Sequence, residues 1–350
     1  MNAPSLEPRK NVRTRYIVLA LIVLAVMAVW SGAWAYGRSV LLGEMDRFIS
    51  NLNRDGVVLS CDRRSVGGFP FRYEVACFGL SASEGEGARG TVTGLSAVAL
   101  IYNPWHVIFE AEGPGNLTDP LTGTAADMDW ESARSSVMFS DEFVRQVDAV
   151  LAKPSIDLKF AGHKGDIEAG AADLHFRAVP DAPQTLEAFV DLKDLSSSFS
   201  PLGKEPLNAR LHVRVDKGMA LMNGVPFERL PVDADGNRSI QIALISLANG
   251  QAEVSAEGQV KINRRGLVSG KVDVTITDVS ETFRLLGKVF PPQSNIPQAL
   301  QGAALAFGAS RTGTNGAQTI TMPLTIVDNK LRVGLIPLGK LPRLFPASDA

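Results

Sequence analysis

The sequence predicts a mainly β fold, or β-rich α+β, in which an N-terminal transmembrane helix precedes antiparallel, curved meander sheets with two or three short helices. Two observations support this prediction. An uncharged apolar segment near the N-terminus is long enough to cross a bilayer. Beyond it, several segments alternate apolar and polar residues with a period of two, which is typical of strands buried on one face.

The composition is that of a folded protein with a large apolar core. The 350 residues are 45% hydrophobic and 21% charged, which is ample apolar material for one large domain or two packed ones. The 35 basic side chains are balanced by 37 acidic ones. Because a surplus of positive charge is missing, we do not expect a nucleic-acid partner.

The predicted membrane anchor is residues 17–36, which carry no charge and span roughly 30 Å as a helix. Residues 1–16 form a basic tail that we expect to stay in the cytoplasm, so the rest of the chain is exported. Trp30, Trp34 and Tyr36 lie at the far end, where aromatic rings favour the membrane interface. The alternative is a secretory signal cleaved after Ala35, which would leave a soluble exported protein.

Residues 37–54 predict a stalk helix that continues or follows the anchor. Its apolar residues recur at helical spacing, and Asp55-Gly56 supplies the end of the helix. The exported β-rich domain then covers residues 55–346. A Pro-rich stretch at 180–183 indicates either a boundary near residue 180 between two sub-lobes or a long loop.

A cysteine hairpin is predicted next. Cys61 and Cys77 flank a turn-forming segment, and a turn centred on Phe69 would place the two cysteines directly opposite each other. We expect a disulfide in an oxidising exported compartment. Two buried free thiols are the alternative if the domain is cytosolic.

Four further strands and three helices are predicted beyond the hairpin. The alternating segments are Leu186–Leu192, Leu207–Asp216, Ala252–Ile262 and Ile320–Ile326, and the tight turns are Asn249-Gly250 and Asp328-Asn329. The helices are Asp141–Ala152 with Ser140 as its N-cap, Val279–Val289, and Pro297–Phe307.

Two internal motifs stand out. The first comprises Cys61, Gly68, Phe69, Pro70, Phe71, Arg72, Tyr73 and Cys77, and the second runs from Tyr102 to Ile108 and includes Asn103, Pro104 and Trp105. Both resemble an uncharacterised bacterial family catalogued as domain of unknown function 2125. The anchor, the stalk and the ending at 333–339 are also similar to that family. The resemblance implies a single-pass anchor in the bacterial inner membrane and a periplasmic β-rich body, loosely AsmA-like in layout, a group implicated in lipid traffic. It brings no catalytic residue.

Other candidate motifs favour structural roles. Residues 85–90 match a dinucleotide pattern, but a strand follows where a helix is needed, so we expect a hairpin loop. His106, His163, His175 and His212 lack the short spacing of zinc ligands. Serine hydrolase signatures are missing, and Asp127 and Asp129 share one strand face as a solvated pair. We therefore expect no catalytic, metal or cofactor residues, with a cryptic enzyme as an alternative.

Two functions remain open. One is lipid or other hydrophobic-ligand binding, or envelope homeostasis, by a module whose sheet offers an apolar groove. The other is a structural or assembly scaffold that binds envelope proteins. A groove predicts apolar side chains left over after the core is filled, whereas a scaffold predicts a filled interior. Two local questions also stay open: Arg72 either pairs with Glu74 or contacts lipid phosphate, and Trp105 either covers a sheet edge or meets a membrane surface.

Overall fold

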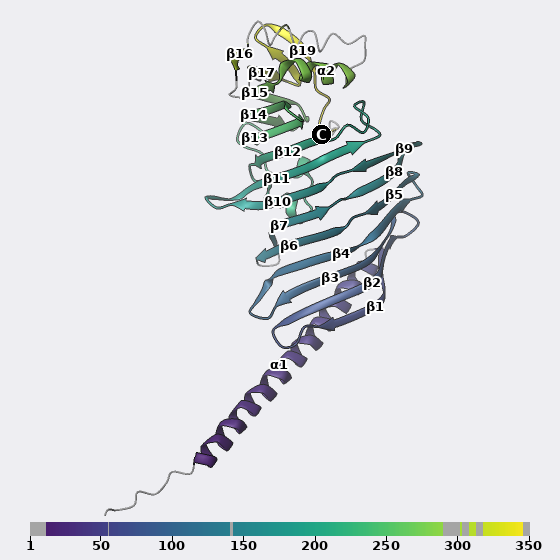
Figure 1. Ribbon diagram of the computed structural model, residues 1–350, viewed down its shortest axis with the longest axis vertical. Coiled ribbons are helices and arrows are strands. Elements are labelled where there is room, and N and C mark those ends of the chain that lie inside the picture. The colour runs from purple at the N-terminus through teal and green to yellow at the C-terminus, as the bar shows by residue number, and fades with distance from the viewer. Residues whose placement is uncertain are drawn as a thin grey trace, which may run out of the picture.

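The computed structural model describes residues 12–54, 56–140, 143–289, 302, 308–312 and 318–345. Helix α1 (Val12–Arg54) is continuous over 43 residues, so the predicted anchor and stalk are one helix. It is the one helix of the described chain that is long and apolar enough to cross a membrane, and its apolar segment is not buried. Figure 1 shows the first half of α1 projecting from the body, while its second half lies against β1 and β2.

Among the described residues, the body is one antiparallel sheet of nineteen strands, which confirms the predicted fold class. The first nine strands are β1 (Val57–Gly67), β2 (Arg72–Glu84), β3 (Arg89–Leu100), β4 (Asn103–Asp119), β5 (Thr124–Asp129), β6 (Ser132–Ser140), β7 (Phe143–Ala152), β8 (Ser155–Phe160) and β9 (His163–Glu168). The others are β10 (Ala171–Val179), β11 (Ala182–Ser197), β12 (Leu207–Val215), β13 (Asn237–Asn249), β14 (Ala252–Asn263), β15 (Val268–Thr277), β16 (Ala309–Thr312), β17 (Gln318–Val327), β18 (Lys330–Val333) and β19 (Ile336–Lys340).

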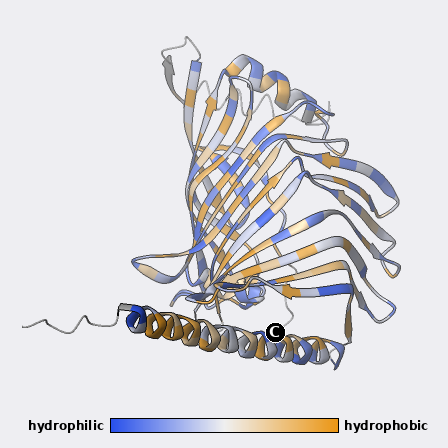
Figure 2. Cartoon of the chain, turned by 60° about the horizontal axis from the view of Figure 1, so that its bottom comes forward, coloured by the Kyte–Doolittle hydropathy of each residue, from blue (hydrophilic) through white to orange (hydrophobic). Residues whose placement is uncertain are grey.

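The middle of the sheet consists of interrupted strands. β4 pairs with β6 along its first half and with β5 along its second, and β11 likewise pairs with β10 and β9. Between them, β5–β6, β7–β8 and β9–β10 are each separated by two residues, at 130–131, 153–154 and 169–170. Interruptions at matching positions in neighbouring strands bend a sheet locally, and Figure 2 shows the strands bending.

One face of the sheet is mostly apolar from β2 to β17. Twelve strands contribute one residue each to a single cross-strand row on this face, which we call the apolar face, and we call the opposite face the polar face. The row reads Cys77, Leu95, Ala111, Ala133, Leu151, Ala172, Leu192, Ala209, Leu247, Val254, Ile276 and Ile320. A second row, two residues further along each strand, contains Val75, Ala97, Phe109, Leu174, Val190 and Met322 among others, and Ser135 of β6 lies in this row between Phe109 and Ala149. Alternation along these twelve strands therefore adds up to one largely apolar surface.

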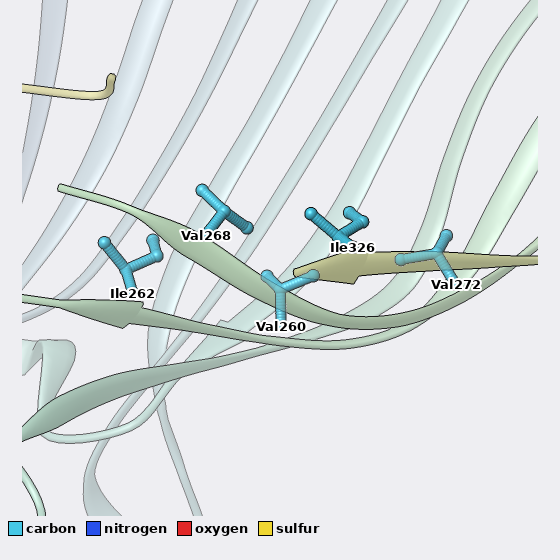
Figure 3. Close-up of a cluster of buried hydrophobic side chains, with 5 residues drawn as sticks. All are labelled: Val260, Ile262, Val268, Val272 and Ile326. Carbon is cyan, nitrogen blue, oxygen red and sulfur yellow. The ribbon is translucent and has the colours of Figure 1, made fainter. Parts of the chain in front are cut away.

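The C-terminal third of the apolar face is a closed core. Residues of β14, β15 and β17 are buried there, and Figure 3 shows the side chains of Val260, Ile262, Val268, Val272 and Ile326 pointing to the same side of these strands. Helix α2 (Val279–Val289) packs on β14, β15 and β17 and adds Phe283 to a second cluster around Met322. The short helix η1 (Gly218–Asn223) covers a third cluster, while η2 (Phe227–Arg229) follows it in the chain.

The predicted helix Asp141–Ala152 is wrong. Phe143–Ala152 forms β7, and Ser140 is the last residue of β6 instead of an N-cap. Val147, Ala149 and Leu151 alternate with residues of the opposite face, and β7 has hydrogen-bonded partners on both sides, β6 and β10. Because a valine-rich segment fits either period, the two neighbouring strands decide its structure.

The predictions elsewhere along the chain agree better with the structure. The four alternating segments lie in β11, β12, β14 and β17, and α2 has the predicted bounds. Gly250, Asp328 and Asn329 have positive φ, as the predicted turns require. The helix expected at 297–307 lies outside the described residues apart from Gly302. Residue 180 falls in the turn between β10 and β11.

The disulfide is confirmed, but the register predicted for it is wrong. The cysteine sulfurs are 2.09 Å apart and the Cα atoms 5.7 Å apart. Cys61 is opposite Leu80, and Cys77 is opposite Arg64, so the two cysteines are not directly opposed. Pairing is interrupted between them at Asp62 and Gly79, and the positive φ of Gly79 belongs to this irregularity.

Candidate functional site

The apolar face is left open over strands β3, β4, β6 and β7. Ten of its side chains there are only half-buried, unlike those of the closed core. These ten residues, which we call the open apolar patch, are Leu95, Ala97, Ala99, Val107, Phe109, Ala111, Val137, Val147, Ala149 and Leu151. Contiguous apolar surface of this kind is uncommon in soluble proteins and marks sites that bind lipid, protein or an apolar ligand.

Two elements border the open apolar patch. On one side, the second half of α1 packs against β1, and Trp34 stacks on Tyr73 of β2 with ring centroids 5.7 Å apart. On the other side, η1 packs on β11, β12 and β7, and Asn223 accepts a hydrogen bond of 3.1 Å from the Val144 backbone. The open apolar patch therefore lies between helix α1 on one side and helix η1 on the other.

The chemistry of the patch suits aliphatic chains. Its ten side chains carry no charge and no hydrogen-bonding group, so they can offer only dispersion contacts and removal of apolar area from water. The row continues to Leu247 on β13, which is 52% exposed. There an apolar cavity of about 170 Å³ is lined by residues that include Leu202, Val254 and Leu285.

Toward β5 and β8, the same side of the sheet becomes acidic. Its next cross-strand row reads Ser81, Thr91, Asn116, Asp127 and Asp157, four residues along β2 and β3 from Cys77 and Leu95. A cavity of about 520 Å³ there is lined by Asp62, Asp127, Asp129 and Asp157, so the two predicted strand partners Asp127 and Asp129 do share a face. In register, Asp127 is opposite Asp157, which is opposite Asp166. A hydrogen bond from Lys204, at 3.0 Å, lowers the pKa of Asp166. Within the described residues, no group of three or more His, Cys, Asp or Glu side chains could hold a metal ion.

A second polar cluster joins residues that are far apart in sequence. Buried Glu187 accepts hydrogen bonds from Arg177, His212 and Arg214 at 2.8 to 3.0 Å. Burial disfavours its carboxylate, but these hydrogen bonds outweigh burial and lower the pKa of Glu187 to about 2. His175 bonds Asp148 at 2.7 Å beside it, and a cavity of about 330 Å³ lies over the cluster.

A histidine and a serine also meet on the polar face. His106 Nε2 lies 2.6 Å from Ser136 Oγ, a pairing that spacing along the chain did not reveal. In the described chain no acidic side chain hydrogen-bonds the His106 ring, so the orienting group of a nucleophile–base–acid set is missing there. His163, the fourth histidine, stands apart at the start of β9.

The structure brings together the two sequence motifs. Gly68, Phe69, Pro70 and Phe71 form the β1–β2 turn, and Arg72 begins β2. Asn103, Pro104 and Trp105 begin β4 in the neighbouring hairpin. Arg72 and Glu74 form a 3.0 Å ion pair with both side chains well exposed. The open apolar patch was not among the sequence predictions, although the alternation of apolar and polar residues in β3 and β4 was the signal that could have found it.

Comparison with known proteins gives a family but no function. A family model described as "Uncharacterized protein conserved in bacteria (DUF2125)" matches residues 34–342, which is most of the chain. No curated protein matches the sequence, and no solved structure matches the fold.

Proposed function

The chain belongs to this family of uncharacterised bacterial proteins, and we propose that it is a membrane-anchored periplasmic module that binds the acyl chain of a membrane lipid on its open apolar patch. The observation that carries the proposal is the largely apolar face of twelve strands, which is buried at its C-terminal end and left half-exposed between α1 and η1.

The energetics favour an aliphatic occupant. Each methylene removed from water contributes about 0.8 kcal/mol, so about ten buried methylenes contribute roughly 8 kcal/mol before the entropic cost of binding. A peptide ligand would bring many backbone amides that need hydrogen-bond partners, and the rows of the patch offer only the side chain of Ser135. The patch also lies beside the anchor helix, so a lipid of the same bilayer is the nearest source of such a chain.

The periplasmic placement rests on two observations. The basic residues of the first sixteen precede the apolar segment of α1, which favours a cytoplasmic N-terminus. Cys61 and Cys77 form a disulfide, and disulfides persist in oxidising compartments such as the periplasm. A C-terminal reporter that is active only outside the cytoplasm tests this placement directly.

The lipid proposal is tested by native mass spectrometry of the full chain extracted in a mild detergent. We expect a co-purifying phospholipid or fatty acid, and uptake of a photoreactive fatty acid that crosslinks to peptides of β3, β4 or β7. Recovery of lipid-free protein without any uptake would refute the proposal.

Two variants localise the binding. Ala97→Trp fills the patch with an apolar ring beside Phe109, its partner in register, and should abolish uptake while keeping the strand. Glu110→Gln is the matched control, because Glu110 lies next to Phe109 but on the polar face. Uptake that survives Ala97→Trp would place the ligand elsewhere.

A scaffold function is the second candidate, and the free edge of the sheet favours it. β1 pairs with β2 and with no other described strand, so its outer edge offers unpaired backbone groups to a partner strand. Crosslinks from Val58 to another envelope protein, combined with lipid-free protein, would support this alternative over lipid binding.

A further inference from the structure

Four large aromatic side chains are exposed at one end of the sheet. Phe69 and Phe71 lie in or beside the β1–β2 turn and are 55% and 60% exposed. Tyr102 and Trp105 lie in or beside the β3–β4 turn and are 77% and 56% exposed. Figure 1 shows these two turns on the same side of the sheet, next to the middle of α1. We call these four residues the aromatic rim.

The β1–β2 turn is fixed to the anchor helix by direct bonds. Trp30 Nε1 donates to the Pro70 carbonyl at 2.9 Å, and Trp34 Nε1 donates to the Arg72 carbonyl at 3.1 Å. The ring of Trp30 lies 6.0 Å from that of Phe71, and the ring of Trp34 meets Phe69 edge-on at 5.6 Å. The turn therefore lies at the height of Trp30 and Trp34 along α1.

That height is one membrane thickness from the basic end of the helix. From Arg15 to Trp34 the helix rises about 28 Å, close to the roughly 30 Å of a hydrocarbon core. Tryptophans at such a position occupy the headgroup interface. The turn bonded to them must lie at the same interface once α1 spans the bilayer.

The second turn lies beside the first. The Ile101 amide donates to the Phe71 carbonyl at 3.0 Å, and Leu100 is opposite Arg72 in the ladder. Adjacent strands are about 4.8 Å apart, so Tyr102 and Trp105 are within a few strand spacings of α1. The β1–β2 turn and the β3–β4 turn therefore lie at the same height along α1.

The charge of the two turns also suits a membrane surface. Residues 66–73 and 100–107 contain no acidic residue, and Arg72 is their one basic side chain apart from His106. Anionic phospholipid headgroups attract arginine and repel carboxylates.

We propose that the aromatic rim seats in the outer headgroup region of the bilayer that α1 spans, and so holds the sheet upright with this end against the membrane. The ends of β2, β3 and β4 then meet lipid directly, and the open apolar patch begins at that level with Ala99 and Val107. The rim shares the membrane-spanning anchor with the proposed lipid-binding function but does not depend on that function.

The test uses the full chain in vesicles of phosphatidylethanolamine and phosphatidylglycerol, with the photo-crosslinking residue p-benzoylphenylalanine in place of Tyr102 or Trp105. The matched control replaces Phe160, which is 58% exposed as the last residue of β8 at the opposite end of the sheet. β4 runs 17 residues from the rim toward that end, up to about 55 Å. We expect about tenfold more phospholipid adduct at the rim positions than at Phe160.

Equal yields of phospholipid adduct at the rim positions and at Phe160 would refute the proposal that the aromatic rim contacts the bilayer. Adducts to protein alone would also refute it. A second experiment in detergent distinguishes adducts to the bilayer from adducts to a lipid bound on the apolar patch. If the rim contacts the bilayer, adducts at Tyr102 should vanish when the protein is extracted and lipid-exchanged into detergent. Adducts that persist there would assign the lipid to the apolar patch and overturn bilayer contact by the rim. If no lipid co-purifies with the protein but phospholipid adducts still form at the rim positions in vesicles, the proposed lipid-binding function is refuted and the contact of the rim with the bilayer is not.

Discussion

Replacing Glu187 by Gln tests whether the buried cluster on the polar face stabilises the sheet. Folding lowers the pKa of Glu187 from its ordinary 4.5 to about 2. That difference corresponds to about 3 kcal/mol of unfolding free energy at neutral pH. Because the side chain is only 5% exposed, solvent screening reduces this figure little. Glutamine keeps the shape but carries no charge, so Glu187→Gln should lose about this amount at pH 7.

The pH dependence gives the prediction its sign. A carboxyl whose pKa is lowered by folding stabilises the protein fully above its unfolded pKa, and this contribution is lost as the pH falls from 4.5 through 2. At pH 3 the wild-type carboxylate contributes about 1.4 kcal/mol, so the gap between wild type and Glu187→Gln should fall to about half.

The assay is guanidinium unfolding of the full chain in detergent micelles, followed by the circular dichroism of the strands, at pH 7 and pH 3. The control is Glu110→Gln, whose ion pair with Arg134 is exposed and should contribute less than about 1 kcal/mol. A gap below about 1 kcal/mol at pH 7 would refute the reasoning. A gap of equal size at both pH values would also refute it.

Three further outcomes follow from the structure. Cys61→Ser opens a disulfide across a sequence separation of 16 and should lower the unfolding free energy by about 3 kcal/mol, seen as a lower guanidinium midpoint; an unchanged midpoint contradicts this. Met322→Ala, at a position 1% exposed, should cost about 2–5 kcal/mol, whereas Met138→Ala, 41% exposed, should cost under about 1; similar calorimetric losses in both would contradict the assigned core. Asn329→Ala leaves the buried Val268 amide without its side-chain acceptor and should cost about 1–3 kcal/mol by thermal unfolding, and a neutral result would argue against that contact.

Several features were determined by local sequence alone. The long apolar helix α1 could be predicted because twenty consecutive uncharged residues of this composition are enough to cross a membrane as a helix, whatever the rest of the chain does. The strands β12 and β14 could be predicted because apolar and polar residues alternate along them, which assigns each residue to one of the two faces of a strand. The Asn249-Gly250 turn follows from the positive φ that glycine tolerates. In each case the deciding energy term lies within a few neighbouring residues.

Other features were decided only by the tertiary structure. β7 is a strand because β6 and β10 lie on both sides of it, and its own pattern also fits a helix. The cysteines are offset because one register runs from Val57 opposite Glu84 to Gly67 opposite Glu74, which centres the turn between Pro70 and Phe71 instead of on Phe69. Glu187 of β11 accepts hydrogen bonds from Arg177 of β10 and from His212 and Arg214 of β12. The apolar patch exists only because many strands align their faces in register. The sequence gives each strand two faces, but hydrogen bonds between distant segments choose which faces join, and that choice creates both the cluster and the open apolar surface.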